Sequence, residues 1–193
     1  MRPFEDLFKE AVAFHGHACP GQVLGVRMAL AGCRALGIEE PKLLHKGLVV
    51  FVEIDRCATD AIEAVTGVSL GKRTLKFLDF GKMAATFVRV DTGSAVRVVA
   101  REEARDLVRR YAPHHEELRA AMLEGYQVMP DAELLRIETV QVRPGWLDRR
   151  RVRVSCDRCH EGINYEREVR RNGLALCRPC AGEGYLDWGD AAT

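Results

Sequence analysis

Apolar side chains recur at three- and four-residue intervals near the start of the chain, at Phe4, Leu7, Phe8, Ala11 and Val12. This spacing predicts an amphipathic helix over residues 3–14, with one face on the core. Pro20 disfavours the helical conformation at Cys19 and instead begins a second helix, which we expect to end at Gly37. The apolar residues of this second helix cover most of its circumference, which indicates burial on several sides and places Cys33 in the core.

A run of β-branched and other apolar residues over 47–54 predicts a central strand. The elements expected after it are a helix over 58–66, strands over 74–80, 84–91 and 95–100, helices over 101–111 and 115–126, and a strand over 135–142. The strands on either side of Gly81 would be joined there, and His114 and His115 would begin the helix over 115–126. The expected fold class is α+β, with helices packed on a mostly antiparallel sheet.

One change of composition divides the chain. Pro144 and Gly145 are followed by a basic run that ends in Arg149–Arg151, and this predicts a boundary within residues 143–151. A chain of 193 residues is long enough for one substantial core and a small appendage. We therefore expect an α+β core domain over residues 1–145 and a small C-terminal module over residues 146–193.

The overall composition is that of an ordinary globular protein, with 47% hydrophobic and 30% charged residues. The net charge of +1 gives no general reason to expect nucleic acid or a membrane as a partner. No apolar run approaches the roughly 18 residues of a spanning helix, and the first ten residues carry acids where a secretory signal carries bases. We therefore expect a cytoplasmic protein.

Four of the seven cysteines form two C-x2-C pairs near the end of the chain, at Cys156, Cys159, Cys177 and Cys180. The 17 residues between the pairs fit the spacing of a tetrahedral zinc site. Four thiolates leave no open coordination position, so the zinc is expected to be structural and to hold the module together. A hairpin through Asn172 and Gly173 and a short helix entered at Ala181 would suit a treble-clef-like fold.

Two other readings of this module are weaker. The segment from Cys156 to His160 matches the C-x-x-C-H pattern of haem attachment, but the second cysteine pair and the absence of an export signal argue against haem. Arg149–Arg151, Arg153 and Arg158 form a basic patch that a nucleic-acid-binding finger would use. Acidic residues alternate with these arginines, which is typical of a solvated linker, so we do not expect nucleic acid.

A second group of metal-ligating residue types lies near the N-terminus. His15, His17 and Cys19 alternate along a segment containing Gly and Pro, and in an extended loop all three side chains point to one side. Cys19 would be the N-cap of the helix at Pro20, where the helix dipole favours a thiolate. Cys57 occupies a similar strand-to-helix junction, with Asp60 one turn further on.

If the fold brings these two junctions together, the five residues form a mixed nitrogen, sulfur and oxygen site that suits zinc or iron. We expect His17, Cys19 and Cys57 to bind the metal, with His15, Asp60 and the Cys19 thiolate in catalytic roles. Direct nucleophilic catalysis by a thiolate is the next option. The non-functional alternative is that the histidines cap the first helix and that the cysteines are small buried apolar residues.

Two lysines are candidates for holding an anionic cofactor or substrate. Lys72 and Lys82 each follow a glycine, so exposed backbone amides and an ammonium group lie together at each position. Lysines in surface turns are the simpler explanation, since the phosphate-loop pattern G-x-x-x-x-G-K-[ST] does not occur.

Five motifs in a shared order carry a family resemblance, at Phe14–Gly21, Arg27–Ala29, Cys57–Gly67, Gly71–Leu75 and Asp79–Lys82. Together they resemble the FmdE family, which takes its name from a component of the formylmethanofuran dehydrogenase complex, over most of residues 4–143. The terminal finger resembles the auxiliary zinc module of some members. The resemblance implies an α+β core, a homodimer, a cleft around the His/Cys segment, and an association with molybdenum- or tungsten-dependent one-carbon metabolism.

Three functions follow, in order of preference. The first is a metal-binding accessory subunit of a formylmethanofuran dehydrogenase-like system, with a larger oxidoreductase as partner. The second is a stand-alone metal- and thiolate-dependent enzyme acting on a small one-carbon or oxyanion substrate. The third is a nucleic-acid-binding finger protein.

Overall fold

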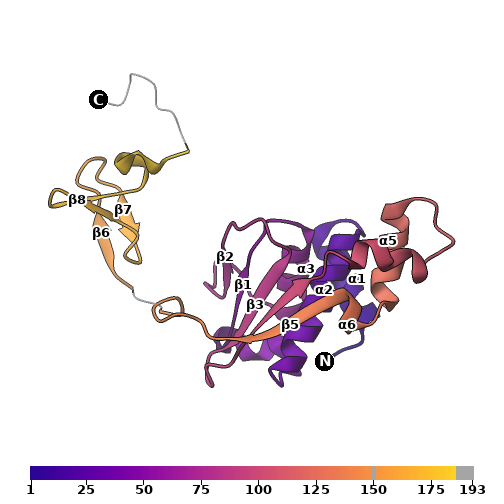
Figure 1. The fold of residues 1–193 in the computed structure, drawn as a ribbon. Helices are drawn as coiled ribbons and strands as arrows, with labels where there is room; N and C mark the ends of the chain where they lie inside the picture. The colour runs from indigo at the N-terminus through magenta and orange to yellow at the C-terminus, as the bar shows by residue number, and fades with distance from the viewer. Residues whose placement is uncertain (149–150, 186–193) are drawn as a thin grey trace. The chain divides into compact units, whose positions relative to one another are not determined.

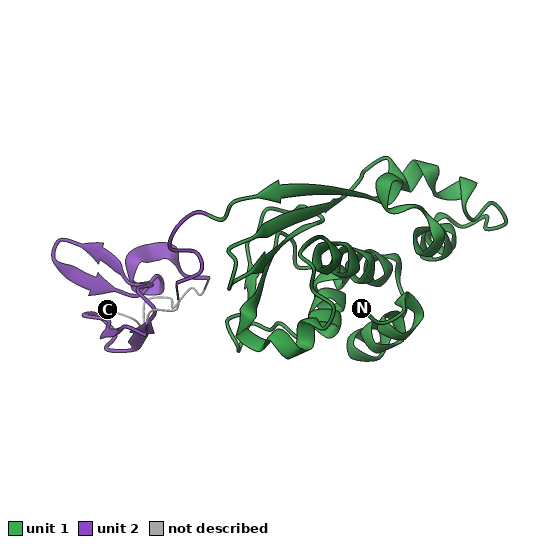
Figure 2. Cartoon of the chain, turned by 90° about the horizontal axis from the view of Figure 1, so that it is seen from below, with its two compact units in different colours: residues 1–142 green, residues 143–193 purple. Residues whose placement is uncertain are grey.

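The computed structural model describes residues 1–148 and 151–185. The chain divides into two compact units, Met1–Val142 and Arg143–Thr193 (Figure 2). Arg149 and Arg150 of the basic run lie outside the described residues. In the part of the chain that is described, no helix combines the length and the hydropathy that a membrane span requires.

The first unit contains helices, 3-10 turns and one sheet: α1 (Phe4–His15), α2 (Pro20–Ala35), η1 (Pro41–Gly47), β1 (Leu48–Val52), α3 (Cys57–Thr66), β2 (Leu75–Phe77), β3 (Ala84–Arg89), β4 (Ala95–Ala100), α4 (Ala104–Leu107), η2 (Val108–Arg110), α5 (Leu118–Val128), α6 (Asp131–Leu134) and β5 (Leu135–Val140). The strand order is β2-β1-β3-β4-β5 (Figure 1). The β1–β2 pair is parallel, whereas β1–β3, β3–β4 and β4–β5 are antiparallel. The predicted α+β class with a mostly antiparallel sheet is confirmed.

The core is built around α2, which lies between α1, α3 and the sheet (Figure 1). Eleven of its 16 residues are buried, which confirms the prediction of burial on several sides. Gly32 lets the helix approach β3, since a Cβ at this position would lie 2.4 Å from the ring of Phe87. Cys33 is fully buried in this core, as predicted, and burial raises the pKa of its thiol to about 12.

Arg27 joins α2 to the C-terminal end of α5. Its guanidinium donates hydrogen bonds to the carbonyl oxygens of Tyr126, Gln127 and Met129 at 2.8, 2.9 and 2.7 Å, and to the carboxylate of Asp131 at 2.6 Å. The last carbonyls of a helix lack partners within the helix, and here a single buried side chain supplies them. This contact explains why an arginine stands in the Arg27–Ala29 motif.

The strand prediction around Gly81 was wrong in one respect. We expected the strands at 74–80 and 84–91 to be joined neighbours, but β1 lies between β2 and β3. The connecting segment wraps around the end of β1, with backbone N–H groups of Leu78 and Phe80 bound to the carbonyls of Val52 and Glu53. These bonds use the backbone groups that a longer β2 would need, so β2 is limited to three residues.

The two helices predicted after β4 also differ from the structure. The expected helix over 101–111 is one α-helical turn, α4, followed by the 3-10 turn η2. The helix expected over 115–126 begins at Leu118, so His114 and His115 lie in the turn before α5 and not at its start. The turns η1 and α6 were not predicted.

The second unit consists of two small antiparallel pairs and a final turn: β6 (Arg153–Ser155) with β7 (Gly162–Asn164), β8 (Val169–Arg171) with β9 (Leu174–Leu176), and the π-helical turn η3 (Pro179–Glu183). Asn172 and Gly173 join β8 to β9 with φ values of 50° and 82°, which confirms the predicted hairpin. Asp157 accepts a 2.6 Å hydrogen bond from the backbone N–H of Ala175 and so ties the first cysteine loop to β9.

Candidate metal centres

The beginnings of α2 and α3 meet because glycines on α2 allow the two helices to approach closely. A Cβ on Gly25 would lie 2.4 Å from the carbonyl oxygen of Ala58, and a Cβ on Gly21 would lie 2.9 Å from the Cβ of Cys57. Cys19 is the extended N-cap residue of α2, and Cys57 is the first residue of α3. The close helix contact therefore brings both thiols to one place.

Three potential ligand atoms converge at this place. One nitrogen of His15 and the sulfurs of Cys19 and Cys57 all lie within 4.8 Å of one another. The Cys19 side chain is buried, with 4% of the residue exposed, while Cys57 is half-buried. The structure thus joins the two junctions that sequence reasoning considered separately.

His15 is oriented by Asp60. Its Nδ1 donates a 2.7 Å hydrogen bond to Oδ2 of Asp60, so in the neutral imidazole the lone pair is on Nε2. This Nε2 atom is buried and has no hydrogen-bond partner among the described residues. A buried acceptor without a partner beside two sulfurs fits a metal ligand, and a carboxylate on the other ring nitrogen is the usual support for such a histidine.

The thiols of this group also suit a cation. The pKa of the Cys57 thiol is raised, first by burial and then by the hydrogen bond and charge of Cys19. Two thiolates side by side repel each other, and a bound cation removes this repulsion. Both sulfurs also lie at helix N-termini, where the helix dipole favours negative charge.

His15 and His17 are placed differently from the extended loop that we expected. His15 is the last residue of α1, and Gly16 ends this helix with a φ of 96°. His17 is exposed and lies outside the converging group, with its ring centroid 4.5 Å from that of His15. The expected alternation of three side chains on one side begins from a helical residue and therefore does not occur.

A pocket of about 450 Å³ borders this group and is lined in part by His15, Cys57 and Asp60. Lys72 and Lys82 are not among its lining residues. Lys72 donates a 3.1 Å hydrogen bond to the carbonyl oxygen of Gly67, and Lys82 lines a separate pocket of about 390 Å³.

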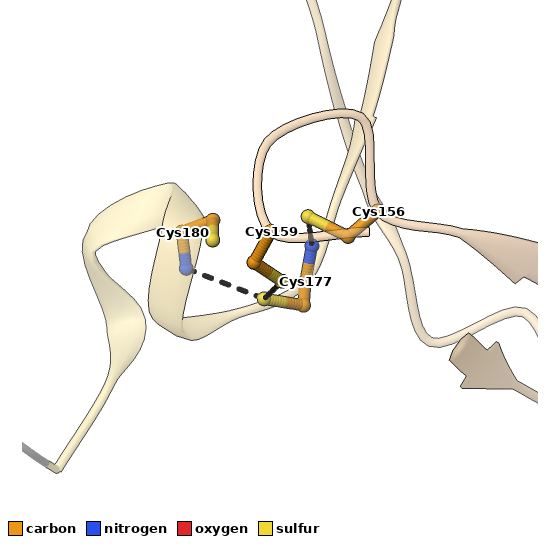
Figure 3. Close-up of side chains that lie close together, drawn as sticks. All are labelled: Cys156, Cys159, Cys177 and Cys180. Carbon is orange, nitrogen blue, oxygen red and sulfur yellow. Dashed lines mark hydrogen bonds between the residues drawn. The ribbon is translucent and has the colours of Figure 1, made fainter. Parts of the chain in front are cut away.

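The second centre is formed by Cys156, Cys159, Cys177 and Cys180, whose sulfurs all lie within 4.8 Å of one another (Figure 3). The sulfurs of Cys159 and Cys177 are 3.8 Å apart. Backbone N–H groups point at two of the sulfurs, from Cys177 to Cys156 at 3.3 Å and from Cys180 to Cys177 at 3.4 Å. These N–H groups stabilise negative charge on sulfur.

The four thiols titrate as one group. Backbone hydrogen bonds from Cys159 and Cys177 lower the pKa of Cys156 to about 6, whereas the neighbouring Cys177 thiol raises the pKa of Cys180 to about 12. Without a cation the first thiolate forms easily and the last one hardly at all. A closed set of four sulfurs therefore fits a metal ion that neutralises them together.

A third group was missed by sequence reasoning. The Nε2 atoms of His114 and His115 lie 3.1 and 2.8 Å from the same carboxylate oxygen of Glu124. Both imidazoles lower the pKa of Glu124. Two consecutive histidines ahead of a predicted helix, followed nine residues later by an acid within it, are the signal that was available.

Comparison with known proteins adds a family to this geometry. The sequence pattern of FmdE, described as "Molybdenum formylmethanofuran dehydrogenase operon", matches residues 14–136. These residues include His15, Cys19, Cys57 and Asp60 and end before the four-cysteine unit.

Two individual proteins are also similar. The chain is 32% identical over 204 aligned residues to a protein of Archaeoglobus fulgidus described as a probable S-adenosyl-L-methionine-binding protein. The alignment covers 93% of this chain and 53% of that protein, so the chain spans about half the length of this relative. A crystal structure of an FmdE-like protein of tungsten formylmethanofuran dehydrogenase, from Syntrophus aciditrophicus, has the same fold, with a TM-score of 0.65, 23% identity and 95% of both chains covered.

Proposed function

Since the chain belongs to the FmdE family, we propose that it is a metal-binding accessory subunit of a formylmethanofuran dehydrogenase-like system. The core site would hold zinc or iron, and the four-cysteine unit would hold a structural zinc in a treble-clef-like fold. The larger oxidoreductase of such a system is the proposed partner, and the chain itself is proposed to act as a homodimer.

The observation that carries this proposal is the buried Nε2 atom of His15. It has no partner in the described chain and lies beside two sulfurs from other helices. We propose His15, Cys19 and Cys57 as the ligands, with Asp60 as the residue that orients His15. His15 thus takes the ligand role that we expected for His17.

Three protein ligands leave a fourth position open in a tetrahedral site. When bound, zinc or iron would supply Lewis acidity to a group entering from the pocket. In this arrangement Asp60 holds the proton of His15 at Nδ1 and keeps Nε2 available. His17, which is exposed and beside His15, is the nearer histidine for transferring a proton.

Metal analysis of the purified full chain tests the proposal. We expect two metal ions per chain, with one lost in Cys19→Ser or Cys57→Ser and the other lost in Cys177→Ser. Cys33→Ser is the matched control, because this thiol is buried in the apolar core and should leave both ions in place. A single ion that is lost only in Cys177→Ser would leave the core site empty and overturn the proposal. Co-purification with a larger oxidoreductase tests the partner, and sedimentation velocity tests the dimer.

The pocket beside the core site supports a second function, a stand-alone metal- and thiolate-dependent enzyme. Its volume of about 450 Å³ lies in the range of small-molecule sites. Turnover that survives removal of all partners and is lost in Cys19→Ser would favour the enzyme over the accessory role. S-adenosyl-L-methionine belongs among the ligands tested, since the Archaeoglobus relative is described as a probable binder of it.

A further inference from the structure

The pocket beside the His15–Cys19–Cys57 group has two unlike sides. His15, Cys57 and Asp60 line one side and belong to α1 and α3. Val52, Leu70, Leu75 and Phe77 line it as well and are all apolar. The apolar residues come from β1, β2 and the loop between α3 and β2, so the two sides are built by different parts of the chain.

Two of these apolar side chains are left in contact with solvent. Leu70 is 63% exposed and Phe77 is 43% exposed, whereas Val52 and Leu75 are buried beneath them. An exposed leucine is ordinary, but two large apolar side chains at the wall of one pocket form a surface that a ligand can cover. Burying them on a ligand would contribute about 25 cal/mol for each Å² removed from water.

The polar lining limits the charge of the ligand. Arg56 is the cation among the described lining residues, and it is exposed at the N-cap of α3. The lining carboxylate of Asp60 is already paired with His15, and Asp55 is exposed. A ligand with a single negative charge on its metal-binding end would be compensated by the ion and by Arg56.

The size of the pocket excludes the smallest candidates as a good fit. A one-carbon oxyanion would occupy a minor part of about 450 Å³ and would leave Leu70 and Phe77 uncovered. A ligand with both an anionic end and an apolar body would use both sides of the pocket.

From these observations we propose that the pocket binds a small organic acid whose anionic head group ligates the core metal and whose aromatic or branched apolar body lies on Leu70 and Phe77. This inference rests on the proposed metal site and names the ligand class of that site.

The test compares two probes that share a head group. Acetohydroxamate and benzohydroxamate both bind metals through the hydroxamate and differ in replacing a methyl by a phenyl group. Each is titrated into the full chain loaded with Co²⁺, and binding is followed by the shift of the cobalt absorption bands. The closed four-cysteine site has no open position and is not expected to respond.

We expect benzohydroxamate to bind the wild-type protein about tenfold more tightly, because the phenyl group covers more apolar surface. Leu70→Ser and Phe77→Ser should each reduce this preference to about threefold or less, with the affinity for acetohydroxamate unchanged. Phe80→Ser is the matched control, since Phe80 is 60% exposed and is not one of the residues that line the pocket.

The outcomes separate this inference from its premise. If the core cobalt bands form but the two probes bind equally, or neither binds, the ligand class is wrong and the metal site stands. If the preference persists in Leu70→Ser and Phe77→Ser, the apolar wall is not responsible and the inference is overturned. If Cys19→Ser removes no cobalt band before any probe is added, the metal site itself is refuted, and this inference with it.

Discussion

Asp60 and His15 are joined by a 2.7 Å hydrogen bond across 45 residues of sequence. The bond connects the end of α1 to the first turn of α3 and sets which nitrogen of His15 is free. The proposed centre therefore depends on a carboxylate that need not touch the ion.

Replacing Asp60 tests this dependence. In Asp60→Asn the charge behind His15 is lost, so we expect the core metal to bind about 10- to 100-fold more weakly while the fold is kept. Competition with a chromophoric chelator measures the change. Asp79→Asn is the control, because Asp79 is an exposed carboxylate that does not line the pocket. Equal affinities of wild type and Asp60→Asn would show that Asp60 does not support the site.

The glycine contact between α2 and α3 makes a second prediction. The added methyl of Gly25→Ala would meet the Ala58 carbonyl oxygen at 2.4 Å and the Ala61 Cβ at 2.6 Å, so the helices must separate. We expect the free energy of unfolding to fall by about 1–3 kcal/mol, together with a loss of core metal. Urea unfolding and metal analysis measure the two effects. Gly71→Ala adds its Cβ to open space and should change neither. Full metal loading in a destabilised Gly25→Ala protein would show that helix spacing does not set the site.

Burial should make Cys33 inert. Its thiol pKa is raised to about 12, so at about pH 8 almost no thiolate is available to react with iodoacetamide. We expect mass spectrometry to find Cys33 unlabelled in the native protein and labelled in urea at the same pH. Labelling of native Cys33 as fast as of exposed Cys159 would mean that α2 does not pack as described.

Glu10 provides a test by pH. Its pKa is lowered by hydrogen bonds from Lys42, at 2.8 Å, and from Arg2. A carboxylate whose folded pKa is lowered stabilises the protein above its ordinary pKa of 4.5, and this contribution is lost as the pH falls through the folded value. Both partners are exposed, so the gain should stay below about 1 kcal/mol.

The melting temperatures of wild type and Glu10→Gln should therefore differ at neutral pH and converge in acid. The difference should also shrink at high salt, because exposed ion pairs are screened. Glu39→Gln is the control, since Glu39 is exposed and follows α2. A difference that does not change with pH would assign the effect to something other than the Glu10 charge.

The elements that could be predicted are those with local causes. Pro20 sets the start of α2 through its own ring, and Asn172 with Gly173 sets the β8–β9 turn through positive φ values. The placement of β2 beside β1 rests on long-range backbone bonds from Leu78 and Phe80, for which the local pattern contains no signal.

The candidate site divides in the same way. The residue types and their positions at helix starts were visible, and so were Cys19 and Cys57 as partners. The exchange of roles between His15 and His17 was not, because it depends on whether α1 ends one residue before or at His15, and helix ends are the least predictable part of a helix. The contact that joins the two sulfurs also depends on Gly21 and Gly25, whose importance appears once α3 is seen against them.

Leu70 and Phe77 have a further consequence through where they lie in the chain. They belong to a loop and a short edge strand, whereas the three converging ligands belong to helices locked together by glycine contacts. Substitutions in the loop and strand can thus accumulate during evolution without disturbing the ion. Relatives that share the ligand triad are free to diverge in the molecules they accept, one surface turn at a time.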